Sequence, residues 1–184
     1  MHNVKSLLTV SGSLRVGSSN AALLAAAGLV APAGVAVRTY DALADLPAFN
    51  PDLEEGPGPV PNAVAHWRAA LATADAVLIS SPEYAHGIPG VLKNALDWVV
   101  GSGELVGKRV GLLSASAASR FAHPQLFEVL TVMSATLVPA ATLVLDVPRR
   151  GATASQLAAD RVLAATLLAA VAALVDVPAR SGEI

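Results

Sequence analysis

Residues 11–20 read Ser-Gly-Ser-Leu-Arg-Val-Gly-Ser-Ser-Asn and follow an apolar run, residues 4–10. This pattern predicts a strand, a tight turn and the start of a helix. The first amides of a helix have no partner within it, and its dipole favours an anion at that end. Arg15 adds a planar cation suited to phosphate oxygens, while Gly12 and Gly17 allow a sharp turn. The segment therefore predicts a phosphate site, whose other polar side chains are those of Ser13, Ser18, Ser19 and Asn20.

Two familiar phosphate motifs and one catalytic motif are not matched. Gly12 and Gly17 have the spacing of the first half of a P-loop, but Ser18 and Ser19 stand where Lys-Ser/Thr is required. The dinucleotide pattern G-x-G-x-x-G and the nucleophile elbow G-x-S-x-G are both absent. A terminal phosphate ester is therefore favoured over a triphosphate or an acyl group. The alternative is an ordinary strand–helix connection with a serine cap.

A second loop, residues 81–88, follows the apolar run 76–80. Pro82 stiffens it, and Tyr84 could cover a face or flank of a flat heteroaromatic ligand whose polar edge meets backbone amides. Glu83 and His86 add polar groups beside it. A rigid connection with a partly buried tyrosine is the alternative here.

Composition limits the class of protein. The 184 residues fit one domain, 54% of them are hydrophobic, and the net charge of −2 argues against nucleic acid as a partner. The chain has no cysteine, which excludes thiolate and Fe–S chemistry, and its four histidines lack metal-ligand spacing. Two-electron chemistry would need a bound organic cofactor. We see neither a signal peptide nor an apolar run long enough to span a bilayer, so we expect a cytoplasmic protein without a membrane partner.

Strand-like and helix-like segments alternate along the chain. Strands that are apolar on both faces and alternate with helices indicate a parallel sheet covered on both sides. Ligands of such sheets bind at the carboxyl ends of strands, where loops 11–20 and 81–88 both lie. Residues 41–61 hold five prolines without periodicity and predict a long functional loop. The expected strands are 4–10, 35–40, 76–80, 108–114 and part of 135–145, and the expected helices are 20–30, 62–73, 88–100, 124–134 and 153–175.

Together, the two loops resemble the NADPH-dependent FMN reductase family, flavodoxin-like proteins that include quinone and chromate reductases. The family's phosphate loop looks like Gly-Ser-Leu-Arg-x-Gly-Ser-x-Asn, matched at residues 12–20. Its second signature looks like Pro-Glu-Tyr-Asn…Pro-Gly-x-Leu-Lys-Asn-Ala-x-Asp-Trp, matched at residues 82–98 with one change. The resemblance implies a single α/β domain over residues 1–184, a flavodoxin-like three-layer sandwich. Its five-stranded parallel sheet would have the order 2-1-3-4-5, with helices on both faces.

The resemblance also implies a bound FMN, with NADPH or NADH as co-substrate and a quinone or similar small molecule as electron acceptor. Hydride transfer would be ping-pong, without a catalytic side chain or a metal. It further implies a homodimer or homotetramer in which the helix after the second loop packs against a partner. By this resemblance, the phosphate lies at the first loop and the ring at the second, largely against backbone atoms. The expected cofactor-binding residues are Ser13, Leu14, Arg15, Gly17, Ser18, Ser19, Asn20, Pro82, Glu83, Tyr84, Ala85, His86 and Ser116.

Two departures from the family pattern leave other functions open. Ala85 stands where the family has asparagine, and the family's glycine-rich loop is replaced by residues 114–122, where Ser116 can still approach the ring. The alternatives are a flavodoxin-type electron carrier and an FMN-free regulatory or assembly protein on the same fold. Candidates for the 2′-phosphate of NADPH are Arg120, Arg149 and Arg150.

Overall fold

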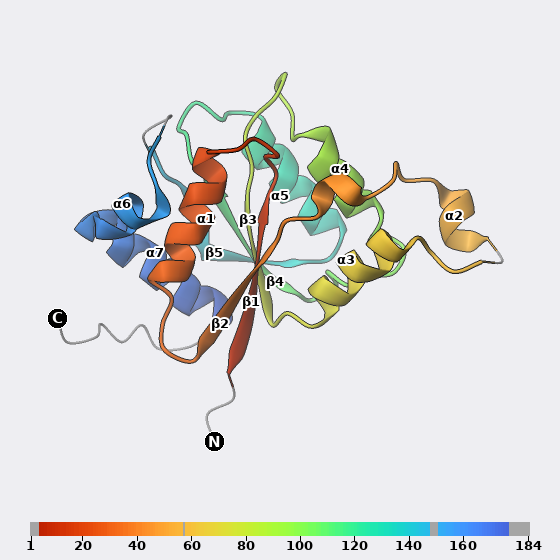
Figure 1. Ribbon diagram of the computed structural model, residues 1–184, viewed down its shortest axis with the longest axis horizontal. Helices are drawn as coiled ribbons and strands as arrows, with labels where there is room; N and C mark the ends of the chain where they lie inside the picture. Colours follow the sequence, from red (N-terminus) through yellow and green to blue (C-terminus); the bar gives the residue numbers. More distant parts are fainter. Residues whose placement is uncertain (1–3, 57, 148–150, 177–184) are drawn as a thin grey trace.

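The computed structural model describes residues 4–56, 58–147 and 151–176 as a parallel sheet between two helical layers (Figure 1). The strand order is β2-β1-β3-β4-β5, and every neighbouring pair is parallel, which confirms the predicted fold class. The predicted strands are confirmed to within a residue at each end. They are β1 (Lys5–Ser11), β2 (Val35–Tyr40), β3 (Ala76–Ser80), β4 (Arg109–Ser114) and β5 (Thr136–Val144).

Helices cover both faces of the sheet and bury a separate apolar core against each (Figure 1). One face carries α1, α6 and α7, and the other carries α3, α4 and α5. The central strand β3 is buried along its whole length, which explains why its sequence shows no alternation of apolar and polar residues. The helices are α1 (Ser19–Leu29), α3 (Asn62–Ala72), α4 (Gly90–Asp97), α5 (Ala122–Val132), α6 (Ala154–Ala159) and α7 (Arg161–Val175).

The segment 41–61, predicted as a long functional loop, contains secondary structure that the prediction lacked. It carries a 3₁₀ turn, η1 (Leu43–Asp45), and a short helix, α2 (Pro51–Glu55). Asn50 caps α2 because its side chain accepts the N–H of Asp52 at 3.0 Å. These local signals, an Asn followed by Pro at the first helical position, are typical of a helix start, but the five prolines obscured them.

Contacts with α4 hold this segment in place. The Asn94 side chain donates to the carbonyl of Pro47 (2.9 Å) and accepts the N–H of Phe49 (2.7 Å). The indole N–H of Trp98 donates to the same Pro47 carbonyl (2.8 Å), and the Phe49 ring lies edge-on to Trp98 at 5.1 Å. Asn94 and Trp98 belong to the second signature, so part of that signature serves to attach the segment after β2.

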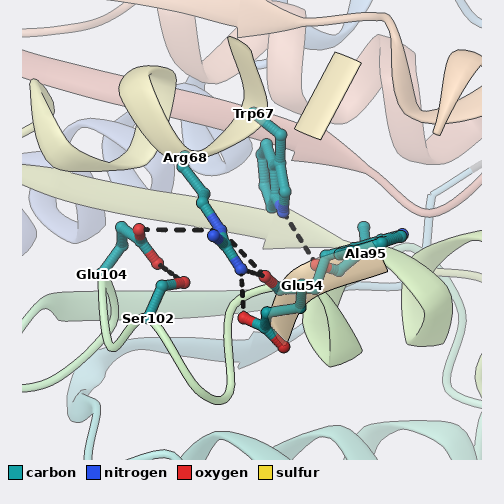
Figure 2. A network of polar contacts seen from close by, with 7 residues as sticks. Glu54, Trp67, Arg68, Ala95, Ser102 and Glu104 are labelled. Carbon is teal, nitrogen blue, oxygen red and sulfur yellow. Dashed lines mark hydrogen bonds and ion pairs between the residues drawn. The ribbon is translucent and has the colours of Figure 1, made fainter. Parts of the chain in front are cut away.

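Arg68 of α3 joins α2 to the end of α4 (Figure 2). Its guanidinium pairs with Glu54 and donates to the carbonyl of Trp98 from Nε (3.1 Å) and Nη2 (2.7 Å). Glu104 lies 4.0 Å from Nε and accepts a hydrogen bond from Ser102 at 2.6 Å. A cation at the carboxyl end of α4 is favoured by the helix dipole. The segment after β2 is therefore fixed both at Pro47 to Phe49 and at α2.

The predicted helix 153–175 is wrong as a single element. It is broken at Asp160 into α6 and α7. The Asp160 carboxylate accepts the N–H groups of Val162 and Leu163, both at 3.0 Å, and so caps α7. An N-cap aspartate inside an apolar stretch is a helix-start signal that continuous hydrophobicity masked.

Strand β5 forms one edge of the sheet and is irregular. Val110 of β4 pairs with Leu137, but Leu112 pairs with Thr142, so β5 carries extra residues between the two pairs. Pro139 lies in this stretch and is exposed. A proline has no N–H to donate, and it is tolerated here because the strand is at the edge.

Candidate functional site

The two predicted loops meet at the carboxyl edge of the sheet. Strands β1 and β3 are neighbours, and Ser11 is in register with Ser80. The N–H of Gly12 continues this pairing by donating to the Ser80 carbonyl at 2.9 Å. A Cβ at Gly12 would lie 2.6 Å from Ser81 Oγ and 3.1 Å from Leu92 Cδ2, so only glycine fits. This crossing is also where the strand order reverses direction, the usual ligand position of an open α/β sheet.

The first loop is held by its own serines. The Ser11 hydroxyl accepts the N–H of Ser13 and donates to its carbonyl, both at 3.2 Å, and Ser13 Oγ accepts the N–H of Arg15 at 3.3 Å. Gly17 has φ +71°, and Ser18 then caps α1 by accepting a first-turn N–H at 3.4 Å. The Arg15 side chain is exposed. The loop thus places serine hydroxyls and one cation around the start of α1.

Asn20, in the first turn of α1, is fixed to the sheet. Its side-chain oxygen accepts the hydroxyl of Ser80 at 2.9 Å, and both residues are buried. Within the described part of the chain, the amide nitrogen of Asn20 makes no hydrogen bond. A ligand in the cavity that Asn20 lines can therefore accept from this nitrogen.

The second loop contains a two-residue turn. Tyr84 and Gly87 exchange backbone hydrogen bonds at 2.9 and 3.0 Å, and Ala85 and His86 between them have φ of +48° and +60°. Two consecutive positive φ values define a type I′ turn, which favours Asn or Gly at its first central position. The asparagine that the family has at Ala85 therefore suits the backbone of this turn. Ala85 does not line the cavity described below, so this departure removes none of its wall.

Glu83 turns its carboxylate toward α5. Its Oε2 accepts the N–H groups of Phe121 (2.7 Å) and Ala122 (3.0 Å) and lies 3.4 Å from Ser119 Oγ. The backbone hydrogen bonds of Ala122 and Phe121 hold the pKa of Glu83 below its ordinary value, with a smaller contribution from His86. The side chain is thus an ionised group that connects the second loop to the start of α5.

A cavity of about 450 Å³ lies where these loops meet. Arg15 and Glu83 are the charged side chains of its lining. Glu83 Oε2 is engaged with α5, and Arg15 is the cation that a ligand meets. Four expected residues, Leu14, Gly17, Ala85 and His86, do not line it. Nine expected residues do: Ser13, Arg15, Ser18, Ser19, Asn20, Pro82, Glu83, Tyr84 and Ser116.

The loop after β4 contributes lining residues that sequence reasoning missed. Ser114 Oγ donates to the carbonyl of Ser116 (2.9 Å), and Ser116 Oγ accepts the N–H of Ala118 (3.2 Å). The first loop has the same arrangement, so a repeated Ser-x-Ser after an apolar run was the available signal. The missed lining residues are Ser114, Ala115, Ala118 and Ser119 at this end of β4, together with Ser81 from the loop after β3.

A larger cavity, of about 620 Å³, lies between the end of β5 and helices α6 and α7. Three of its polar side chains serve the helices: Gln156 and Asp160 take part in caps, and the Thr166 hydroxyl donates to the Val162 carbonyl. The remaining one, Asp146, is exposed and acidic, and no Lys or Arg stands among the described lining residues to receive an anion. The smaller cavity therefore has the better chemistry for a ligand.

Other expected groups lie outside the cavity. Arg120 is exposed and does not line it, and Arg149 and Arg150 fall outside the described residues. Among residues 4–56, 58–147 and 151–176, no cluster of His, Asp and Glu could hold a metal ion. Over the same residues, no helix combines the length and apolarity needed to cross a bilayer.

Comparison with known proteins identifies the family. The family described as NADPH-dependent FMN reductase matches residues 6–147, a span that includes both loops and all five strands except the first residue of β1. The chain belongs to this family. An NAD(P)H-dependent FMN reductase from Pseudomonas aeruginosa is 42% identical over 114 residues, 60% of each chain. A quinone reductase from Escherichia coli K12 is 37% identical over 93 residues, 50% of this chain and 49% of the relative. The matches thus span about half to three-fifths of the length of these curated members of the family.

The fold of the family extends over nearly the whole chain. The solved structure of FerB, a flavoenzyme NAD(P)H:(acceptor) oxidoreductase from Paracoccus denitrificans, superimposes with a TM-score of 0.70 at 26% identity. The superposition covers 94% of this chain and 96% of FerB.

Proposed function

We propose that this protein is an FMN-dependent NAD(P)H oxidoreductase that passes electrons to a quinone or similar small acceptor. The observation that carries the proposal is the 450 Å³ cavity. One end is lined by Arg15 and the serines at the start of α1, and the other end by Pro82, Tyr84 and the backbone of the loop after β3. Its volume lies within the range of small-molecule sites, roughly 300–1,000 Å³. The names of the two relatives, FMN reductase and quinone reductase, support the same substrates.

The residues present fit FMN in one orientation. Arg15, the hydroxyls of Ser13 and Ser18 and the start of α1 suit its phosphate. The other end of the cavity, at Pro82 and Tyr84, offers an apolar face and backbone groups suited to the ring. The Asn20 amide, fixed by Ser80, lies on the phosphate side.

FMN, when bound, supplies the hydride chemistry, and the protein's part is to bind, orient and shield it. Arg15 neutralises phosphate charge, and the loops after β3 and β4 orient the ring. We propose a ping-pong order, in which NADPH or NADH binds and leaves before the acceptor enters the same cavity. Both flat substrates would have to reach the same ring in this one cavity of about 450 Å³, which suits successive rather than simultaneous binding.

The first test is the visible spectrum of the pure protein, followed by a coupled assay. We expect absorption bands near about 375 and 450 nm after FMN is added, since these mark an oxidised flavin. NADPH or NADH oxidation that depends on added quinone, such as menadione, would then support turnover. A coloured protein without turnover would favour an electron carrier. A protein that takes up no FMN would refute the proposal in favour of a binding or regulatory role. A homodimer or homotetramer and a cytoplasmic location stay predictions from sequence.

A further inference from the structure

Helix α5 begins without a capping side chain of its own. Phe121 stands at its N-cap position and makes no side-chain cap, and the first turn holds no acidic residue. The first amides and the positive end of the helix dipole are therefore left to another group. Glu83, on a loop 38 residues before Phe121, supplies both the acceptor and the negative charge.

Two further contacts join the same loops. The side-chain oxygen of Gln125, on α5, accepts the N–H of Ile88 at 2.8 Å. The rings of His86 and Phe121 stack at 4.3 Å with a tilt of 28°. Together with the Glu83 hydrogen bonds, these contacts connect the loop after β3 to the start of α5, and so to the loop after β4, at three places. Both loops line the proposed flavin cavity.

We propose that Glu83 is a positioning residue that holds the two ring-side walls of the cavity at a fixed separation. This inference rests on the proposed function. Pro82 and Tyr84 flank Glu83 on one wall, and Ser116 and Ser119 lie on the other. Because the carboxylate faces α5, its contribution is to hold the cavity ready for the ring, which lowers the ordering cost of binding. The same backbone hydrogen bonds that lower its pKa favour the ionised carboxylate.

The experiment compares Glu83→Ala, Glu83→Gln and a matched control, Glu128→Ala. Glu128 lies on the outer face of α5 and makes no hydrogen bond or ion pair with the described residues. Dissociation constants for FMN and for riboflavin are measured by quenching of flavin fluorescence. Amide hydrogen exchange of Phe121 and Ala122 is measured by NMR on the flavin-free protein.

We expect Glu83→Ala to weaken FMN and riboflavin by the same factor, on the order of tenfold, because the phosphate end is untouched. Exchange of the Phe121 and Ala122 amides should accelerate by a similar factor. Glu83→Gln should recover most of both losses, since its amide oxygen can accept the same N–H groups. Glu128→Ala should match the wild type. A general loss of stability would instead raise exchange throughout the chain and would not be restored by glutamine.

The possible failures are distinguishable. If the wild type binds both flavins and Glu83→Ala binds them equally well, the inference is wrong and the proposed function stands. A loss for FMN but not for riboflavin would also overturn it, since that places the effect at the phosphate. If the wild type binds neither flavin, the proposed function fails and the positioning role fails with it.

Discussion

Arg15→Ala is the most direct test of the phosphate end of the cavity. Within the described residues the Arg15 side chain makes no hydrogen bond or ion pair, and it is exposed, so its removal should leave the fold unchanged. A hydrogen bond to a charged group is worth about 1.5–3 kcal/mol. The dissociation constant of FMN should therefore rise about 10- to 150-fold. Riboflavin lacks the phosphate, so its affinity should not change.

The assay is a titration of flavin-free protein with FMN and with riboflavin at low and high salt. Because the site is open to solvent, added salt should weaken FMN binding by the wild type more than by the variant. Arg15→Lys keeps the charge but loses the planar fork, so its loss should be intermediate. Equal loss for FMN and riboflavin would mean that Arg15 acts on the ring or on the fold. Unchanged FMN affinity in Arg15→Ala would refute the assignment of the phosphate loop.

Three further predictions concern the framework of the site. Ala85→Asn should raise the free energy of unfolding by about 0.5–1 kcal/mol, because asparagine tolerates the positive φ at this position better than alanine; an unchanged urea midpoint would contradict this. Asn94→Leu should lower the free energy of unfolding by about 1–3 kcal/mol, because the partly buried N–H of Phe49 loses its acceptor. The control Lys93→Ala removes only a partly exposed ion pair and should cost at most about 0.5 kcal/mol in the same thermal or urea unfolding. Burial lowers the pKa of His123, so the unfolded chain takes up this proton first, and stability should fall as pH drops below about 6.5. His123→Leu should reduce that fall in unfolding measured from neutral to mildly acidic pH, and identical pH profiles would show that the histidine does not contribute.

The sheet was predictable because its strands are continuous apolar runs between turn signals. Burial on both faces makes β3 apolar from Ala76 to Ile79, and this pattern can be recognised in the sequence without knowledge of the tertiary structure. The helices after it were harder, since apolar composition hid the cap at Asp160 that divides α6 from α7. The sequence predicts a loop at 41–61, because the contacts that fix this segment come from Asn94 and Trp98, which are distant in sequence. Local patterns cannot report such contacts.

The site was predictable where its residues share one loop and less so where they come from several. The motifs identified the first loop and Pro82 to Tyr84. Of the expected cofactor-binding residues, all but Leu14, Gly17, Ala85 and His86 line the cavity. The contribution of the loop after β4 depends on the position of that strand beside β3, which no local pattern specifies. Glu83 was expected near the ring through its backbone. That its carboxylate caps a helix 38 residues away needed the structure.

The irregular edge at β5 limits how copies of this chain can associate. A strand from a neighbouring molecule could not pair regularly with β5, because Pro139 has no N–H to donate and the register of β5 is irregular in this stretch. Edge-to-edge growth on this side would therefore leave backbone groups without partners. Self-association that avoids this cost must use the outer surfaces of the helices or the opposite strand, β2, and the same irregularity protects the protein against fibrillar aggregation through β5.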